Sequence, residues 1–222
     1  NLRCWAEIDL AALERNLHKI RAALPPGIKY VSVVKADAYG HGIHPTAARL
    51  MQTGVDLFAV ANVKEAMDIR EMGSGWPVLI LGPLLEEEDQ TLLEYNLIPT
   101  LSDESELNRF IKLGKKQGKP LPIHLKVDTG MGRMGCWWEK APSLLEKVLQ
   151  TPEVELQGVL THFPLPHDFD FTNLQRERFL EVIRPAISAK PNLLVHADNS
   201  SSLQSMGRNS PFNGIRIGLL QF

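Results

Sequence analysis

Short apolar runs alternate along the chain with segments of helical periodicity. Continuous runs of roughly four to eight apolar residues are typical of parallel strands that are buried on both faces. They predict eight strands, at 29–35, 57–61, 78–81, 98–101, 123–127, 156–161, 193–197 and 215–219. The run at 98–101 is the weakest, because Pro99 cannot donate a hydrogen bond to a neighbouring strand.

The segments between these runs predict helices. Asp9 is a suitable N-cap for a helix at 10–24, whose large apolar residues share one face and which ends at Pro25-Pro26-Gly27. Further helices are expected near 43–53, 62–72, 86–95, 103–117, 139–150 and 172–189, with a short one near 200–206.

Strict alternation of strands and helices predicts right-handed crossovers and a parallel sheet. Eight such units close into a TIM (β/α)8 barrel, which is the α/β fold that we expect. The leading helix would then occupy the place that a helix after the last strand normally takes. A doubly wound open sheet is the structural alternative.

Composition argues against several classes of protein. The chain has 222 residues, 44% of them hydrophobic, and a formal net charge of −2, so no basic face favours nucleic acid. No apolar run approaches the roughly 18 residues of a membrane span, and the N-terminus lacks the apolar core of a signal peptide. The two cysteines, Cys4 and Cys136, stand outside any metal-binding or redox pattern, which favours a cytoplasmic protein.

The ends of the chain bear on its domain organisation. The chain starts without methionine and stops in the apolar run 218–222. Native domains rarely end on a strand with no polar residues after it. We therefore interpret residues 1–222 as a single barrel domain from a longer, two-domain polypeptide.

Polar residues recur where the predicted strands end. Lys35 ends the first strand, Arg133 follows the fifth, His162 ends the sixth, Ser200 follows the seventh and Arg216 lies in the eighth. Barrel enzymes carry their active sites at the C-terminal ends of the strands, so these side chains are expected on one rim. Lysines and histidines with only structural roles would show no such bias.

Lys35 is the strongest candidate for chemistry. Burial at a strand end favours the neutral amine, which is the nucleophile in Schiff-base formation. An isolated lysine would more often be a surface residue, but the ten residues 33–42 (VVKADAYGHG) resemble the pyridoxal-phosphate lysine motif of alanine racemases. His41 and His44 are better explained as turn and helix-start residues than as metal ligands, because no carboxylate or cysteine stands at ligand spacing, and no metal is expected.

Further segments resemble the same family. Residues 126–135 (KVDTGMGRMG) are similar to its K-x-D-T-G-M-[GN]-R segment, 161–163 (THF) to the segment after its sixth strand, and 215–219 (IRIGL) to its [VI]-R-x-G-[IL]. Asn199 and Ser200 open a short predicted helix, and barrels often bind phosphate at such a place after strand seven.

The resemblance implies a role for each candidate residue. Lys35 would bind pyridoxal 5'-phosphate covalently, and Arg216, whose position in an apolar strand demands a partner, would face the pyridine nitrogen. Arg133 would contact the cofactor's phenolic oxygen and help to place the substrate. His162 would pack against the pyridine ring and align Arg216. Lys126 stands where the family often carries a carbamylated lysine.

A separate set of residues would hold the rest of the cofactor, its phosphate above all. The family motifs place this set at Tyr39, Asn199, Ser200, Gly218 and Leu219. Two positions depart from the family pattern: Asp198, where alanine is common, and Gln221-Phe222, where Tyr-Gly is usual.

The family's activity is the pyridoxal-phosphate-dependent interconversion of L-alanine and D-alanine, which supplies D-alanine for bacterial peptidoglycan, and its members act on this small amino acid as homodimers. Lys35 would be the base on one face of Cα. In the family, the base on the opposite face is a tyrosine from the partner's C-terminal domain. The sequence contains three tyrosines, Tyr30, Tyr39 and Tyr95. We therefore expect this chain to bind the cofactor but to racemise alanine poorly or not at all.

Two alternatives stay open. Single-domain pyridoxal-phosphate homeostasis proteins share this barrel and about this length, and residues 206–207 and 215–218 faintly resemble their C-terminal region. Another amino-acid racemase or a decarboxylase on the same barrel is the third reading. The segments 33–42 and 126–135 favour the alanine racemase.

Overall fold

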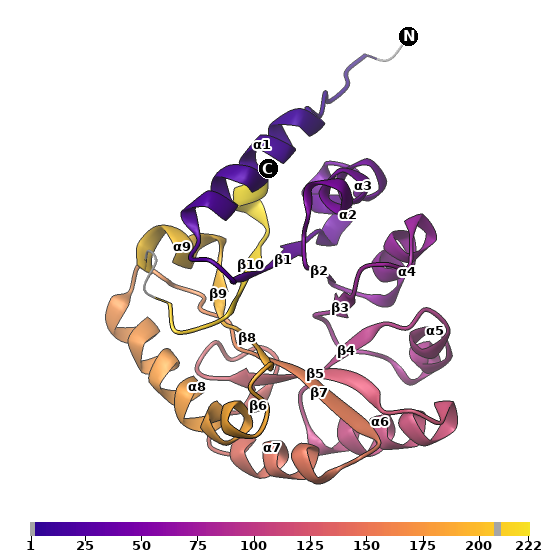
Figure 1. The fold of residues 1–222 in the computed structure, drawn as a ribbon, viewed down its shortest axis with the longest axis vertical. Coiled ribbons are helices and arrows are strands. Elements are labelled where there is room, and N and C mark those ends of the chain that lie inside the picture. The colour runs from indigo at the N-terminus through magenta and orange to yellow at the C-terminus, as the bar shows by residue number, and fades with distance from the viewer. Residues whose placement is uncertain (1–2, 207–209) are drawn as a thin grey trace.

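Parallel strands form an almost closed barrel in the computed structural model, which describes residues 3–206 and 210–222 (Figure 1). The strands are β1 Lys29–Val33, β2 Leu57–Val60, β3 Val78–Ile80, β4 Ile98–Leu101, β5 Leu121–Asp128, β6 Cys136–Trp137, β7 Val154–Leu160, β8 Leu194–His196, β9 Asp198–Asn199 and β10 Gly214–Ile217. Their order is β8-β7-β5-β4-β3-β2-β1-β10-β9, and the short β6 pairs with β5 off this path.

The ring closes through β8, which lies in the strand predicted at 193–197, and through β9, an additional short strand that follows it after a break at Ala197. Strand β8 pairs with β7 through His196 and Leu160, and β9 pairs with β10 through Asn199 and Arg216. Each predicted strand is found, including the strand with Pro99, which is β4. The barrel prediction is therefore confirmed, and the chain does not form the open doubly wound sheet.

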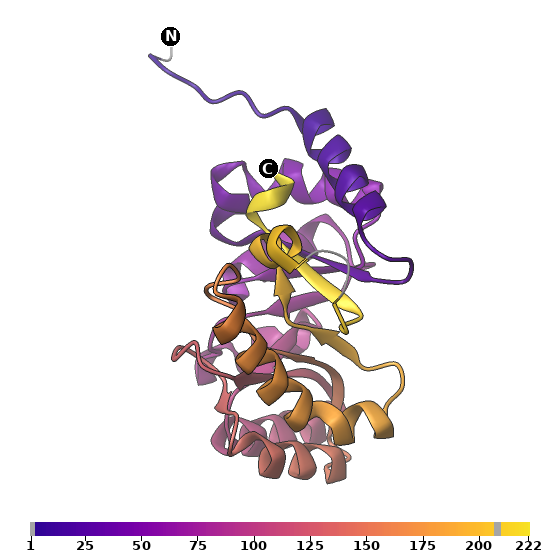
Figure 2. The ribbon, with the colours of Figure 1, turned by 90° about the vertical axis from the view of Figure 1, so that its left-hand side faces the viewer.

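Helices surround the barrel (Figures 1 and 2). They are α1 Leu10–Ala23, α2 Lys35–Gly40, α3 Ile43–Thr53, α4 Val63–Met72, α5 Asp89–Glu94, α6 Glu104–Gln117, α7 Ala141–Gln150, α8 Phe169–Ala189 and α9 Ser200–Met206, with 3-10 turns η1 Glu86–Glu88 and η2 Leu219–Gln221. The predicted N-cap Asp9 is confirmed, because its carboxylate accepts a bond from the Ala11 N–H at 2.8 Å. Helix α8 begins before the predicted residue 172, because Asp168 caps it by accepting from the Phe171 N–H at 3.0 Å. Over residues 3–206 and 210–222, no helix is long and apolar enough to cross a membrane.

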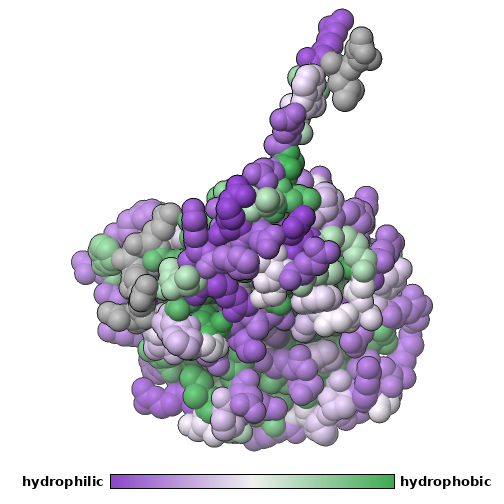
Figure 3. Space-filling model, turned by 45° about the horizontal axis from the view of Figure 1, so that its top comes forward, coloured by the Kyte–Doolittle hydropathy of each residue, from purple (hydrophilic) through white to green (hydrophobic). Residues whose placement is uncertain are grey.

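Helix α1 takes the place expected for a helix after the last strand, beside the C-terminal turn η2 (Figures 1 and 2). The Asn16 amide donates to the Gln221 carbonyl at 3.2 Å. The buried Gln221 side chain accepts from the Ser32 hydroxyl at 2.9 Å and donates to the Val33 carbonyl at 3.1 Å. Residues 3–8 project away from the barrel (Figure 3), and Trp5 is 70% exposed.

The interior of the barrel has two chemically different halves. Strands β1 to β4 contribute a separate apolar cluster, made of Val31, Val33, Leu57, Ala59, Leu79 and Ile98. Strands β5, β8 and β10 instead contribute five buried polar side chains: His124, Lys126, Asp128, His196 and Arg216. Buried polar groups need hydrogen-bond partners, so this second half of the barrel must contain an organised polar network.

The segment after Lys35 is the main departure from the predicted fold. The sequence predicts a glycine-rich turn, but α2 is a turn of left-handed helix in which Ala36, Asp37, Ala38 and Tyr39 have φ angles from 52° to 55°. A left-handed helix costs about 1–2 kcal/mol for each residue with a side chain, because Cβ approaches the following carbonyl oxygen. Other parts of the structure must therefore hold this turn in place.

Gly114 tests the packing of α6 against the barrel. A Cβ at Gly114 would overlap the backbone carbonyl oxygen of Glu153, which cannot swing away. We expect Gly114→Ala to lower the free energy of unfolding by about 1–3 kcal/mol, although alanine is the better helix former. Urea unfolding followed by circular dichroism measures this. Gly75→Ala, whose Cβ would meet no atom within 4 Å, is the control, and equal losses in the two variants would contradict the prediction.

Candidate functional site

A cavity of about 460 Å³ opens at the C-terminal ends of the barrel strands. All ten residues predicted from the sequence as site residues border it: Lys35, Tyr39, Lys126, Arg133, His162, Asn199, Ser200, Arg216, Gly218 and Leu219. Apolar side chains such as Val33, Leu81 and Leu160 form the wall of the cavity between them. An apolar pocket of this size with a few convergent polar groups is typical of a small-molecule site.

Lys35 and Tyr39 reach the cavity from the two ends of the left-handed turn. Both side chains are half-buried, and burial raises the pKa of Tyr39, so its hydroxyl keeps its proton and can donate it in a hydrogen bond. A Cβ at Gly218 would overlap the Tyr39 hydroxyl. Glycine at this position therefore lets the hydroxyl approach the backbone that follows β10.

The Ser200 hydroxyl lies at the same corner of the cavity. Its oxygen accepts bonds from the backbone N–H groups of Gly218 at 3.0 Å and Leu220 at 3.3 Å. These two donors occupy the oxygen's lone pairs, so its proton is left for an acceptor in the cavity. Asn199 differs, because its amide donates to the Phe163 carbonyl at 3.0 Å and shapes the loop. Ser200 and Tyr39 thus form a donor corner that suits an anion.

Arg216 is a buried cation whose partners are mainly carbonyl groups. Its Nη2 donates to the carbonyls of Thr161 at 2.7 Å and Ala197 at 3.2 Å, and its Nη1 donates to the His196 carbonyl. Burial lowers the pKa of Arg216 to about 10, while the negative charge of Asp198 raises it. The guanidinium therefore stays protonated at neutral pH, and Asp198, a departure from the family pattern, supports its charge.

Two buried histidines without a role in the sequence analysis continue this network. His196 Nδ1 lies 3.2 Å from Arg216 Nη1, and His196 Nε2 lies 2.9 Å from His124 Nδ1. Arginine can only donate, so His196 Nδ1 accepts, and His196 Nε2 carries the proton that it donates to His124. Burial is the main cause that lowers the pKa of His124 to about 3 and the pKa of His196 well below 6.5. The sequence signal was the spacing of His124 and Lys126, which puts both on one face of a strand.

His162 and Lys126 complete the polar half of the cavity. His162 Nδ1 lies 3.3 Å from Arg216 Nη2. Burial, and then the charge of Arg216, lowers the pKa of His162 to about 3, so this imidazole is neutral as well. Burial, and then the charge of Arg133, lowers the pKa of Lys126 to about 8. Part of the Lys126 population is therefore a neutral amine near neutral pH.

A loop after β5 carries Arg133 to the rim of the cavity. The Asp128 carboxylate shapes the loop by accepting bonds from the N–H groups of Gly130 and Gly132, both at 3.0 Å. Gly135 has a φ of 114°, and a Cβ there would lie 2.9 Å from the Asp128 nitrogen. Arg133 is exposed and makes no hydrogen bond or ion pair with any residue that the structure describes. Its guanidinium is available to a ligand.

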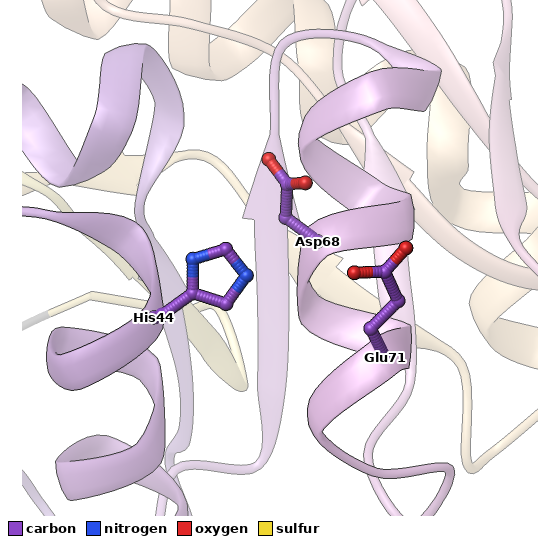
Figure 4. Close-up of side chains that lie close together, drawn as sticks. All are labelled: His44, Asp68 and Glu71. Carbon is purple, nitrogen blue, oxygen red and sulfur yellow. The ribbon is translucent and has the colours of Figure 1, made fainter.

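A second group of potential ligands lies between α3 and α4 on the outside of the barrel (Figure 4). Ligand atoms of His44, Asp68 and Glu71 all lie within 4.8 Å of one another. No carboxylate stands at ligand spacing from His44 along the chain, but folding brings Asp68 and Glu71 close to it. His44 and Glu71 are exposed, and the proximity of the three side chains is the sole observation in favour of an ion. We therefore assign no metal here.

The fold and the cavity define a class of protein. It is a (β/α)8 barrel that offers a small ligand an amine, a buried guanidinium and a corner of hydroxyl donors. The family model described as "Alanine racemase, N-terminal domain" matches residues 8–222, and the chain therefore belongs to this family.

Individual relatives agree with this assignment. The chain is 35% identical over 202 residues to the alanine racemase of Halothermothrix orenii, a match that covers 90% of the chain and 53% of that relative. It is 36% identical over 226 residues to the alanine racemase of Geobacter sp. strain M21, covering 97% of the chain and 59% of the relative.

Solved structures give the same result. The alanine racemase of Clostridium difficile 630 superposes with a TM-score of 0.93 at 27% identity, covering 100% of this chain and 59% of that one. The alanine racemase of Bartonella henselae with covalently bound pyridoxal phosphate superposes with a TM-score of 0.85 at 25% identity, covering 97% and 59%. The chain thus spans little more than half the length of the proteins it matches.

The buried imidazoles make stability depend on pH in a defined direction. Folded His124 stays neutral down to about pH 3, whereas the unfolded chain protonates it near 6.5, so the unfolded state binds more protons as the pH falls. As the pH falls from roughly 6 to 4, we expect His124 to lower the free energy of unfolding by up to about 1.4 kcal/mol for each pH unit. Urea unfolding of the native chain and of His124→Gln should show the steeper loss in the native chain.

Nitrogen-15 NMR checks the same prediction without a variant. His124 and His196 should both show the neutral form with its proton on Nε2 at about pH 5. A charged imidazolium signal from either residue at that pH would contradict the proposed direction of the network.

Proposed function

We propose that this chain is the cofactor-binding barrel of an alanine racemase and that it binds pyridoxal 5'-phosphate covalently through Lys35. The observation that carries the proposal is the placement of Lys35, Arg216 and Ser200 around one cavity of about 460 Å³. The complete protein would interconvert L-alanine and D-alanine in the cytoplasm as a homodimer, and so supply D-alanine for peptidoglycan.

The residues present fit the three ends of this cofactor. Lys35 offers the amine that its aldehyde requires, and the buried Arg216 offers an N–H donor for its pyridine nitrogen. The hydroxyl protons of Ser200 and Tyr39 suit its phosphate. When bound, pyridoxal phosphate supplies an electron sink that makes the α-proton of an amino acid removable.

The chain's own side chains would then orient the ligand and move one proton. Lys35 Nζ would accept the α-proton on one face of the substrate. Arg216 stays protonated and donates, so it would leave the pyridine nitrogen without a proton. Neutral His162 lies 3.3 Å from Arg216 Nη2 and would keep that guanidinium in line. Arg133 at the rim would hold the cofactor's phenolic oxygen and help to place the substrate.

Lys126 would act on Arg133 as a carbamate. Carbon dioxide adds to a neutral amine with loss of one proton, and a pKa of about 8 gives Lys126 such a neutral fraction. The resulting anion would offset the positive charges of Arg133 and Arg216, both of which lower the pKa of the unmodified Lys126. Whole-protein mass spectrometry in bicarbonate buffer, with Lys126→Met as the comparison, tests for the added carboxylate.

Racemisation also needs an acid or base on the opposite face of Cα. Tyr39 borders the cavity but lies against Gly218, and Tyr30 is buried beside Gln221. Tyr95 packs against the hydrophobic core. We therefore propose that the second group is a tyrosine of a partner subunit, beyond residues 1–222.

A single-domain pyridoxal-phosphate carrier is the second candidate function. The observation in its favour is that the described residues around the cavity include groups that suit the cofactor, and none of their tyrosines is placed to act as a second base. Of the segment 206–207 that suggested it, Gly207 lies outside the described residues. Arg133 favours the racemase. Its exposed guanidinium borders the cavity and has no hydrogen-bond or ion-pair partner among the described residues, so it can bind a substrate, which a carrier would not require.

Covalent attachment at Lys35 is tested by trapping. The chain is incubated with pyridoxal phosphate, the covalent adduct is reduced with borohydride, and the labelled residue is located by peptide mass spectrometry. We expect the label on Lys35 and about tenfold less total label in Lys35→Ala, because Lys35 borders the cavity whose other residues suit the rest of the cofactor and would hold the aldehyde beside its amine. Lys29→Ala, which removes a 59%-exposed lysine from the same strand, is the control and should label normally. Equal labelling of the native chain and Lys35→Ala would remove Lys35 from this role.

Turnover separates the racemase from its isolated barrel. We expect this chain to racemise alanine at least roughly 100-fold more slowly than an intact alanine racemase, because one of two acid–base groups is missing from the cavity. A D-amino-acid oxidase coupled assay measures the rate. A rate equal to that of the intact enzyme would show that the second base lies within residues 1–222.

A further inference from the structure

Glu65 joins the left-handed turn to the neighbouring strand end. Its Oε1 accepts a hydrogen bond from the Ala36 N–H at 2.8 Å, and its Oε2 accepts one from the Ala61 N–H at 2.8 Å. Ala36 directly follows Lys35, and Ala61 follows β2 on the wall of the cavity. One half-buried carboxylate therefore connects the backbone beside Lys35 to the adjacent rim of the barrel.

The turn depends on such anchors because its backbone is unfavourable. Its four left-handed residues include no glycine. At the start of the turn, the Ala36 N–H has Glu65 as its acceptor. From the next residue, the Asp37 carboxylate accepts from the Ile43 N–H at 2.7 Å and ties the turn to α3. Lys35 and Tyr39 therefore project from a segment that two carboxylates hold in a strained conformation.

We propose that Glu65 is a positioning residue for Lys35. Its bond to Ala36 fixes the peptide next to Lys35 and, through the turn, the direction in which Lys35 and Tyr39 enter the cavity. Glu65 itself does not border the cavity, so it acts through the backbone and not by contact with a ligand. The inference rests on the proposed function, because the reaction of Lys35 is part of that proposal.

Glu106 is a matched control within the same chain. Glu65 and Glu106 are each the third residue of the helix after a strand, in α4 and α6. Each donates its N–H to the N-cap side chain, Asn62 at 3.0 Å or Asp103 at 2.9 Å. Each also accepts, through Oε2, the N–H of the residue before that N-cap, at 2.8 Å and 2.6 Å. The two glutamates differ in their second oxygen. Oε1 of Glu65 accepts the Ala36 N–H of the turn after Lys35, and no such bond is made by Oε1 of Glu106 to any described residue.

The experiment compares Glu65→Gln with Glu106→Gln. Glutamine keeps the size and one acceptor oxygen, but its NH2 group would face an N–H donor. If each glutamate served only to cap its helix, the two variants would behave alike. We expect Glu65→Gln to slow borohydride-trapped attachment of pyridoxal phosphate to Lys35 by about tenfold, the scale of one hydrogen bond to a charged group, and Glu106→Gln to stay within about twofold of the native chain.

Hydrogen exchange supplies a readout that needs no cofactor. The peptide covering residues 35–42 should exchange about tenfold faster in Glu65→Gln than in the native chain or in Glu106→Gln. Adding Ala36→Gly to Glu65→Gln should restore most of the attachment rate, because glycine adopts a positive φ without the Cβ penalty. This rescue also keeps the test valid if Glu65→Gln alone is less stable.

The outcomes separate this inference from the proposed function. Equal slowing in the two glutamine variants, or unchanged exchange over residues 35–42 in a folded Glu65→Gln chain, overturns the positioning role. Faster exchange over 35–42 in Glu65→Gln, combined with a native chain that never labels Lys35, supports the anchoring of the turn and overturns the proposed function instead.

Discussion

The rest of the site depends on a guanidinium buried inside the barrel. Removing an unpaired charge from water costs several kcal/mol or more, and among the described residues no carboxylate lies within ion-pair distance of Arg216. Carbonyls of Thr161, His196 and Ala197 take its protons instead. Ala197 also lies at the break between β8 and β9. The break releases a carbonyl from the ladder, so an irregularity of the sheet helps to solvate the cation.

Burial, and then the same charge, keeps the nearby imidazoles neutral, and the charge also bears on what the cavity attracts. Four basic side chains border it, Lys35, Lys126, Arg133 and Arg216, and none of the described residues that border it is acidic. A protonated His162 would add a further positive charge beside Arg216, but burial, and then the charge of Arg216, lowers the pKa of His162 to about 3. A pocket with this balance concentrates anions. A ligand that carries both phosphate and carboxylate groups would fit it far better than a neutral or cationic one.

The fold could be read from the sequence because its signals are local, whereas parts of the site depend on distant contacts. Apolar runs, caps and strict alternation were enough to predict the barrel, eight of its strands and every described helix except α2, whereas the two-residue strands β6 and β9 were not predicted. The tendency of barrel enzymes to carry their sites at the C-terminal strand ends predicted one rim for the candidate residues, and they border one cavity. The left-handed turn could not be predicted, because alanine, aspartate and tyrosine do not favour positive φ and the acceptor for Ala36 lies 29 residues away in Glu65. The partners of His124 and His44 were missed for the same reason: they lie 72 residues away at His196, and at Asp68 and Glu71 on another helix.

The second departure from the family pattern sets a distance that the proposed chemistry requires. Gln221 belongs to η2, the turn that also carries Leu219 at the edge of the cavity. Its buried amide bonds to Ser32 and to the carbonyl of Val33, two residues before Lys35. The turn is therefore fastened to the strand that delivers the amine. The proposed cofactor carries its aldehyde and its phosphate on one rigid ring and would have to reach Lys35 and the Ser200 corner together. On that proposal, the spacing of these two elements matters more than the identity of either side chain that fastens them.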